Sequence, residues 1–182
     1  MEITEKTKTS LILKVLHVIA WLIFVGLSIE AGGLIVNFFF SVFKPEFVSN
    51  LYQKLDLSKM YQQSQWAFFG MYSFVLVISI LKATLFYIVI DLHYKLDLSK
   101  PFSSSVAKKI SQISYSTFSI GILSYIARQT AKNLSHHGYE IDKLTQFWVD
   151  SQAFILMAAI VYVIAQIFKS GIEIQSENDL TV

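Results

Sequence analysis

Two charged residues stand inside long apolar stretches, and they are the first candidates for chemistry. Glu30 interrupts the run from Leu11 to Phe43, and Lys82 interrupts the run from Trp66 to Ile90. A charged side chain within a membrane-spanning segment is costly and marks a functional site by default. A carboxylate and an ammonium at such a depth form either a structural ion pair or a site that binds an ion or a proton and changes state.

The two charges also fall at similar heights. If the ends of the two apolar runs are level, the heights of Glu30 and Lys82 differ by roughly 3 Å, at about 1.5 Å of rise per residue. The same count brings His17 level with Asp91, near the other end of the helical hairpin. We therefore predict an intramembrane Glu30–Lys82 pair that fixes the register of two helices, with an ion or proton site as the alternative.

Other arrangements of reactive residues are weak. His136 and His137 are adjacent, near Glu140 and Asp142, instead of having the i, i+4 spacing of a helical metal site. We interpret them as part of a solvated loop. The sequence contains no cysteine, no glycine-rich phosphate loop and no GxSxG turn. We expect no catalytic residues, no metal and no cofactor, and hence a protein that is not an enzyme.

The composition favours a membrane protein. Hydrophobic residues make up 54% of the 182 residues and charged residues 15%, whereas about a quarter of a soluble domain is charged. The net charge of +2 is small, and Arg128 is the only arginine. We therefore expect contact with the lipid bilayer and no direct binding of nucleic acid.

Four apolar segments predict an all-α membrane protein, with a four-helix transmembrane bundle forming a single domain over residues 1–182. The helices are expected at about residues 11–43, 66–93, 106–134 and 151–174. The first has a basic start like a signal peptide, but no small-x-small cleavage pattern follows it, so we expect a retained helix. The third is rich in serine, which we interpret as close helix packing, with a polar pathway as the alternative.

The segment of residues 44–65 connects the first two helices. After Pro45 its apolar residues recur at helical spacing. This pattern predicts a short amphipathic helix at the membrane surface, in the first extracytoplasmic loop.

The lysines predict the orientation. With four spans both termini share one side, and the short loop between the second and third helices collects Lys95, Lys100, Lys108 and Lys109. The positive-inside rule then places both termini in the cytoplasm. Trp66 and Trp148 are expected at the opposite face as interfacial anchors.

The C-terminal tail is a candidate for docking a partner. Acidic and apolar residues alternate there, with more apolar side chains than a solvating acidic tail needs: Glu177, Asp179, Leu180 and Val182. We expect this tail to take part in binding.

Several stretches of the chain resemble the bacterial membrane family known as domain of unknown function 2975 (DUF2975). They are Leu81-Lys82-Ala83, the Pro101-Phe102-Ser103 turn, the helix exit at residues 165–171, and the ending at residues 177–182. The resemblance implies a small four-helix protein of the bacterial cytoplasmic (inner) membrane, often encoded beside a small helix-turn-helix regulator. The family has no established activity, so it supplies no catalytic residues.

These observations predict a non-enzymatic membrane partner or sensor that engages a cytoplasmic regulator, such as a small helix-turn-helix protein. The alternative is a small transporter or ion-coupled protein that uses Glu30, Lys82 and the hydroxyl-rich third helix. A third class is a structural or immunity-type protein that acts by binding another membrane protein.

Overall fold

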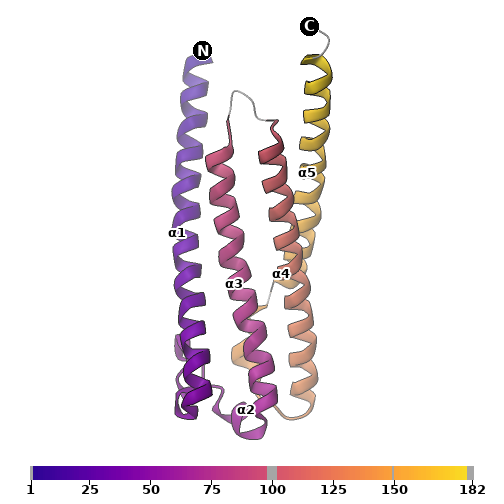
Figure 1. The fold of residues 1–182 in the computed structure, drawn as a ribbon. Coiled ribbons are helices and arrows are strands. Elements are labelled where there is room, and N and C mark those ends of the chain that lie inside the picture. Colours follow the sequence, from indigo (N-terminus) through magenta and orange to yellow (C-terminus); the bar gives the residue numbers. More distant parts are fainter. Residues whose placement is uncertain (1, 98–101, 149, 180–182) are drawn as a thin grey trace.

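The computed structural model describes residues 2–97, 102–148 and 150–179, and almost all of them are helical. Four long helices lie side by side, each antiparallel to the next in sequence (Figure 1): α1 (Glu2–Phe43), α3 (Gln65–Lys95), α4 (Ser104–His136) and α5 (Ser151–Asp179). The start of α1 and the end of α5 lie at the same end of the molecule, here called the terminal end (Figure 1). The opposite end, the capped end, carries the short elements that join the helices.

The long helices follow from the apolar runs and from local caps. Ser64 Oγ accepts the Ala67 N–H at 3.3 Å where α3 begins, and Ser103 Oγ accepts the Val106 N–H at 3.4 Å where α4 begins. A serine at this position satisfies a backbone N–H that the helix itself cannot.

Three segments are long and apolar enough to cross a membrane: Leu11–Phe43, Gln65–Lys95 and Asp142–Glu177. The prediction of an all-α chain with several membrane-spanning candidates is therefore confirmed. Helix α4 is of similar length but does not join them, because serine, threonine and glutamine lower its hydropathy.

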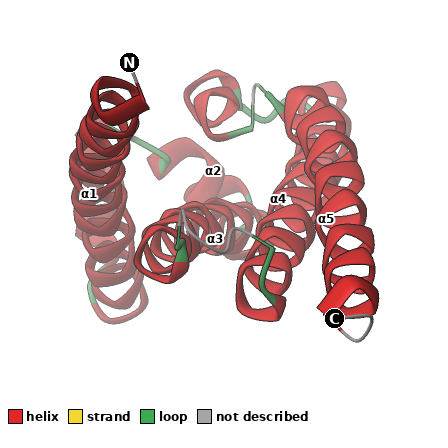
Figure 2. Cartoon of the chain, turned by 90° about the horizontal axis from the view of Figure 1, so that it is seen from above, coloured by secondary structure: helices red, strands yellow, loops and turns green. Residues whose placement is uncertain are grey.

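The four helices form a row in the order α1, α3, α4, α5 (Figure 2). Within the described residues, α1 has extensive helix contacts with α3 and none comparable with α4 or α5. Large apolar side chains cover the outward faces, including Leu22, Ile29 and Phe39 on α1 and Leu156 and Ile160 on α5. Such a surface suits a hydrocarbon environment and would be a liability in water.

The connection between α1 and α3 differs from the predicted amphipathic helix. It forms η1 (Pro45–Ser49), η2 (Tyr52–Lys54) and the short helix α2 (Ser58–Gln63). Lys54 has a positive φ of 59°, and the Leu51 N–H donates to Leu55 O at 2.9 Å, so the chain turns back on itself here. The apolar residues of this segment are buried in the protein core instead of lying on a membrane surface, as Val48, Leu51, Leu55, Leu57 and Met60 show.

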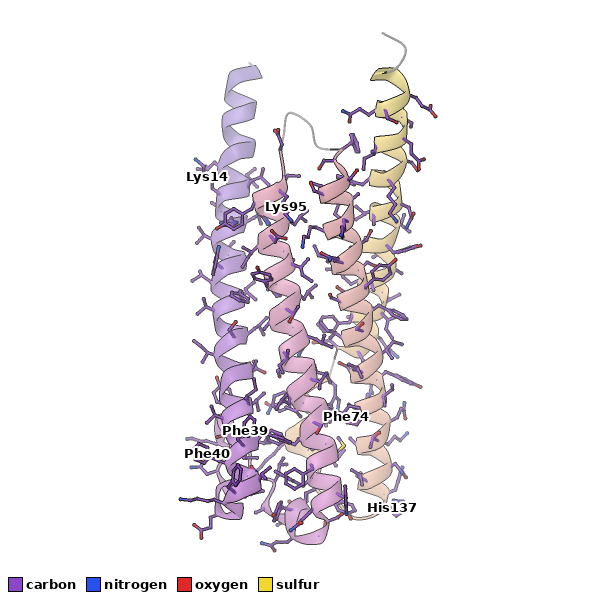
Figure 3. The ribbon with its side chains drawn as sticks, viewed as in Figure 1. Lys14, Phe39, Phe40, Phe74, Lys95 and His137 are labelled. Atoms are coloured by element: carbon purple, nitrogen blue, oxygen red, sulfur yellow. The ribbon has the colours of Figure 1, made fainter. Side chains whose placement is uncertain are left out.

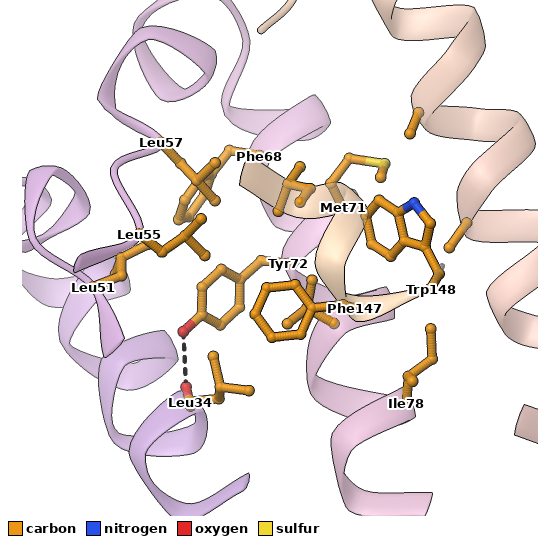
Figure 4. Packing of buried hydrophobic residues seen from close by; sticks show 14 of the residues in the cluster. Leu34, Leu51, Leu55, Leu57, Phe68, Met71, Tyr72, Ile78, Phe147 and Trp148 are labelled. Atoms are coloured by element: carbon orange, nitrogen blue, oxygen red, sulfur yellow. Dashed lines mark hydrogen bonds between the residues drawn. The ribbon is translucent and has the colours of Figure 1, made fainter. Parts of the chain in front are cut away.

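The main core lies at the capped end, where this connection meets α3 and η3 (Asp142–Phe147) (Figure 4). The Tyr72 hydroxyl donates to Leu34 O at 3.1 Å and joins α3 to α1 (Figure 4). Trp148 is 3% exposed and packs in this core, so the expectation that it is an interfacial anchor is wrong. Trp66 is 90% exposed, as an interfacial residue would be.

Two polar contacts order the connection further. The backbone N–H and the hydroxyl of Ser58 both donate to Asp56 Oδ1, at 3.0 and 2.7 Å, and these bonds lower the pKa of Asp56 below its usual value. Lys59 donates to Glu140, and this bond raises the pKa of Lys59. The Lys59–Glu140 pair thus ties α2 to the loop before η3, although an exposed pair of this kind contributes little to stability.

Candidate functional site

Lys82 joins three elements of the fold. From the middle of α3 its Nζ donates to Phe147 O at 3.3 Å and lies 6.0 Å from the ring centre of Phe154. Phe147 ends η3, and Phe154 lies in the first turn of α5. The carboxylates of Glu30 and Asp150 attract the ammonium electrostatically. The half-buried Lys82 therefore holds η3 and the start of α5 against α3.

Glu30 faces α3 at nearly the same level. Its Oε1 accepts the Ser79 hydroxyl at 3.5 Å, and Ser79 lies one turn before Lys82 on α3. The structure thus brings Glu30 and Lys82 to one part of the α1–α3 interface, while each side chain hydrogen-bonds to a different group. The carboxylate of Glu30 and the nearby ammonium of Lys82 attract each other across this interface.

His17 and Asp91 also take separate partners. Asp91 Oδ2 accepts from Lys109 Nζ at 2.7 Å and from Lys95 Nζ at 3.2 Å, so it links α3 to α4. His17 Nε2 accepts the Trp21 indole N–H at 3.1 Å. Figure 3 shows Lys95 at the terminal end of α3.

The His17 ring instead contacts the last turn of α3. Its centre lies 5.6 Å from that of His93 and 4.8 Å from that of Tyr94, in an edge-on arrangement with the tyrosine. At this end α1 and α3 are therefore in contact through the aromatic ring of His17 and those of His93 and Tyr94, and not through His17 and Asp91.

Three hydroxyl groups of α4, those of Ser111, Thr117 and Ser119, bond to the backbone of the same helix. Ser111 and Thr117 each donate to the carbonyl oxygen four residues earlier, at 3.0 and 2.7 Å. Ser114 donates across the interface to Ala158 O of α5 at 2.9 Å. A Cβ atom on Gly121 would lie 2.7 Å from Ile155 Cγ1 and 3.0 Å from Ile155 N. These contacts are those of closely packed helices.

A further contact at the terminal end had no place among the predicted site residues. Phe102 packs on Gly171, where a Cβ atom would lie 2.6 Å from the Phe102 ring, and the Phe102 and Phe168 ring centres are 5.3 Å apart. The contact joins the start of α4 to the end of α5. Aromatic residues often follow prolines, and glycines are common within apolar helices. Neither feature alone predicts the contact, which is visible only in the folded structure.

The remaining predicted residues lie at the two ends. Glu177 is exposed near the end of α5, and Asp179 is the last residue of that helix; Leu180 and Val182 lie outside the described residues, as does Lys100. His137 is exposed, and its Nδ1 pairs with Asn133 O at 2.9 Å. Within the described part of the chain, no group of three or more His, Cys, Asp or Glu residues could hold a metal ion.

Comparison with known proteins gives one match. The family model described as protein of unknown function (DUF2975) matches residues 53–182. This range begins within η2 and takes in α2, α3, α4 and α5, while α1 lies before it. No curated protein and no solved structure matches the chain.

Proposed function

The chain belongs to the family described as protein of unknown function, DUF2975, and from this premise we propose that it is a non-enzymatic protein of the bacterial inner membrane. In this proposal it crosses the bilayer four times and binds a cytoplasmic partner at its terminal end. The observation that carries the proposal is that α1 and α5 both continue as helices beyond the level at which α3 ends and α4 begins (Figure 1).

The fourth crossing is α4. Its stretch from Ile110 to Ala127 contains no charged residue and is long enough to span roughly 27 Å of hydrocarbon, at 1.5 Å per residue. Several of its hydroxyls are buried against α3 and α5 or bonded to backbone carbonyls. Its exposed side chains in this stretch are largely aromatic or aliphatic, including Tyr115, Phe118, Ile122 and Tyr125. Apolar groups outside and polar groups inside suit a helix that faces lipid.

The orientation follows from the terminal end. Lys95, Lys108 and Lys109 gather there, where α3 ends and α4 begins. The positive-inside rule favours the cytoplasm for this end. Both termini then lie in the cytoplasm.

The topology can be tested directly because the chain contains no cysteine. We expect His137→Cys, in the exposed loop after α4, to react with a membrane-impermeant maleimide in intact spheroplasts of a bacterial host. Ser176→Cys, exposed near the end of α5, is expected to react only after the membrane is permeabilised. Both variants should label equally in permeabilised spheroplasts, which is the control. The same labelling of both in intact spheroplasts would rule out a single crossing by α5 between them. The reverse pattern would invert the orientation.

The end of α5 suits partner binding. Glu173, Ile174 and Glu177 are exposed there, and its last turn contains no basic residue. Acidic side chains near a helix C-terminus are unfavourable for the helix itself, because the carbonyl end of the helix dipole is negative. An acidic and apolar helix end is better explained by a partner with a basic, partly apolar surface, such as a small helix-turn-helix regulator.

Deleting residues 175–182 is expected to leave insertion and thermal unfolding unchanged, because the contacts of Ala158, Ile155 and Gly171 of α5 all lie before the deleted residues. The same deletion is expected to abolish copurification of the regulator from detergent. Glu173→Gln combined with Glu177→Gln should weaken capture at unchanged helix length, and Ser176→Ala should leave it intact. Full capture by the truncated protein would exclude the tail as the docking element, and loss of folding would make the tail structural.

The ion-coupled alternative rests on Glu30. This half-buried carboxylate lies in the second half of α1 and accepts a long hydrogen bond from Ser79, while Lys82 donates to Phe147 O. A charged residue within a membrane-spanning segment is a candidate functional site by default. Substitution of Glu30 distinguishes the two functions, as set out in the Discussion.

A further inference from the structure

A groove runs along one side of the α1–α3 interface. At the terminal end it widens into a cavity of about 560 Å³, lined by Leu13, Lys14 and His17 of α1 and by His93, Tyr94 and Leu96 of α3. Nearer the middle of the molecule a second cavity, of about 340 Å³, is lined by Phe24, Ser28 and Gly32 of α1 and by Ile80, Ala83 and Tyr87 of α3. The first cavity has a polar rim, and the second is mainly apolar, with Ser28 and Thr84 also in its lining.

The two cavities lie on the same face of the helix pair. His17 and Phe24 are seven residues apart on α1, and Tyr87 and Tyr94 are seven residues apart on α3. Seven residues make almost two helical turns, so each pair lies on one stripe of its helix. The Phe24 and Tyr87 rings, with centres 6.0 Å apart, contact each other across the interface. The two cavities therefore follow one another along one face of the helix pair, with this ring contact between them, and together they are called the groove.

The groove has the depth of one membrane leaflet. From His17 to Ala31, which lines the inner cavity, the helix rises by roughly 21 Å. Half of the hydrocarbon core of a bilayer is about 15 Å thick. The polar cavity thus lies at the level of lipid headgroups when the apolar cavity lies among acyl chains.

The polar cavity is suited to an anion. None of the residues that line it is acidic, and the side chain of Lys14 is exposed at its edge. His17 Nε2 accepts the Trp21 N–H, so in the neutral ring Nδ1 carries the proton and is a donor. The nearby carboxylate of Asp91 is already bound to Lys95 and Lys109. Figure 3 shows Lys14 and Lys95 at the same end of the molecule.

We propose that this groove binds an anionic phospholipid, with its phosphate at Lys14 and His17 and one acyl chain along the apolar part of the groove between Phe24 and Ile80. The positive charge at headgroup level selects an anionic lipid over a zwitterionic one, because basic pockets between membrane helices bind anionic headgroups. The apolar extension selects a lipid over a free anion. This proposal is independent of the partner proposed for the tail of α5.

The test is a titration of the full-length protein, purified in a non-ionic detergent and freed of lipid. Phosphatidylglycerol, phosphatidylcholine with the same acyl chains, and inorganic phosphate are added separately. Native mass spectrometry counts the bound molecules, and thermal unfolding reports their effect on stability. We expect phosphatidylglycerol to bind and to raise the unfolding temperature, and the other two to do neither.

Two variants test the two parts of the groove. Lys14→Gln is expected to weaken phosphatidylglycerol binding about fivefold, the effect of one lysine near an anionic surface, and Lys44→Gln at the far end of α1 to leave it unchanged. Gly32→Leu fills the apolar cavity, where a Cβ meets no atom within 4 Å, and should abolish retention of the lipid. Gly26→Leu, equally free of contacts but outside the groove, is its control.

Ala83→Leu fills the same cavity from α3 and serves as the test if Gly32→Leu does not fold. Equal binding of phosphatidylcholine, equal stabilisation by inorganic phosphate, or equal behaviour of each variant and its control would overturn the proposal.

Discussion

Replacing Lys82 by methionine is expected to lower the free energy of unfolding by about 2–4 kcal/mol. The substitution leaves Phe147 O without its donor from α3 and removes the cation that attracts Glu30 and Asp150. Because η3 and the start of α5 are held through this contact, the loss affects the packing of three elements. Reversible unfolding in mixed micelles measures the change.

The matched control is Lys59→Met, which removes an exposed lysine from a salt bridge with Glu140 and is expected to change stability little. A loss of similar size in both variants would show that the position of Lys82 is unimportant.

Adding Glu30→Gln to Lys82→Met is expected to restore part of the lost stability, since neither charge then remains unbalanced at this level of the interface. Strictly additive effects of the two substitutions would show that the charges do not interact. A stable double variant that still captures its partner favours the partner function. The ion-coupled function is favoured if the double variant is stable but has lost its biological output, and if Glu30→Gln alone has also lost that output.

Gly121→Leu is expected to destabilise the protein by about 3 kcal/mol, because the added side chain has no room between α4 and α5. Two of the three nearest atoms to its Cβ position belong to the backbone of α5, Ile155 N at 3.0 Å and Ser151 O at 3.2 Å, so a side-chain rotation cannot relieve the contact. Loss of the compact form in size-exclusion chromatography and a lower unfolding temperature are the readouts.

Gly70→Leu is the matched control for this prediction. Gly70 is an exposed helical glycine of α3 with no atom within 4 Å of its Cβ position, so leucine is expected to be tolerated there and to favour the helix slightly. Equal destabilisation at both positions would mean that α4 and α5 do not approach as closely as the structure shows.

The long helices were predictable because an apolar run of this length has few other stable conformations. The expected ranges of 66–93 and 106–134 agree closely with α3 (Gln65–Lys95) and α4 (Ser104–His136). The first helix begins earlier than expected, at Glu2, because nothing in the polar N-terminal residues interrupts a helix that the following run already favours. The end of α5 extends past residue 174 for the same reason.

The arrangement of the helices was not predictable from pattern alone. In a membrane protein both the core-facing and the lipid-facing side chains are apolar, so periodicity does not identify the packed face. The row of helices, in which α3 is the main helical neighbour of α1, therefore has no simple signal in the sequence. The short connection after α1 was misjudged for a related reason, since its apolar residues lie in a core formed by distant segments such as Leu144 and Phe147.

The heights of the charged residues along the helices could be predicted from the sequence, but their hydrogen-bond partners could not. Helical rise places Glu30 and Lys82 at similar heights, and in the structure Glu30 accepts a hydrogen bond from Ser79, one turn before Lys82. The acceptor of Lys82 is the main-chain carbonyl of Phe147. Every residue has such a carbonyl, so the sequence does not indicate which one accepts the bond. The cavity at Lys14 and His17 likewise depends on side chains of two helices that come together only in the folded chain.

The close pairing of α4 and α5 also bears on the order in which the chain enters the bilayer during synthesis. Helix α4 leaves the ribosome before α5, and it is the least apolar of the four long helices. Its Ser114 acquires the acceptor on Ala158, and its Gly121 acquires the neighbour Ile155, only when α5 has followed. We therefore expect α4 to wait at the membrane interface and to insert together with α5 as a hairpin, so that a chain cut after α4 leaves that helix outside the hydrocarbon.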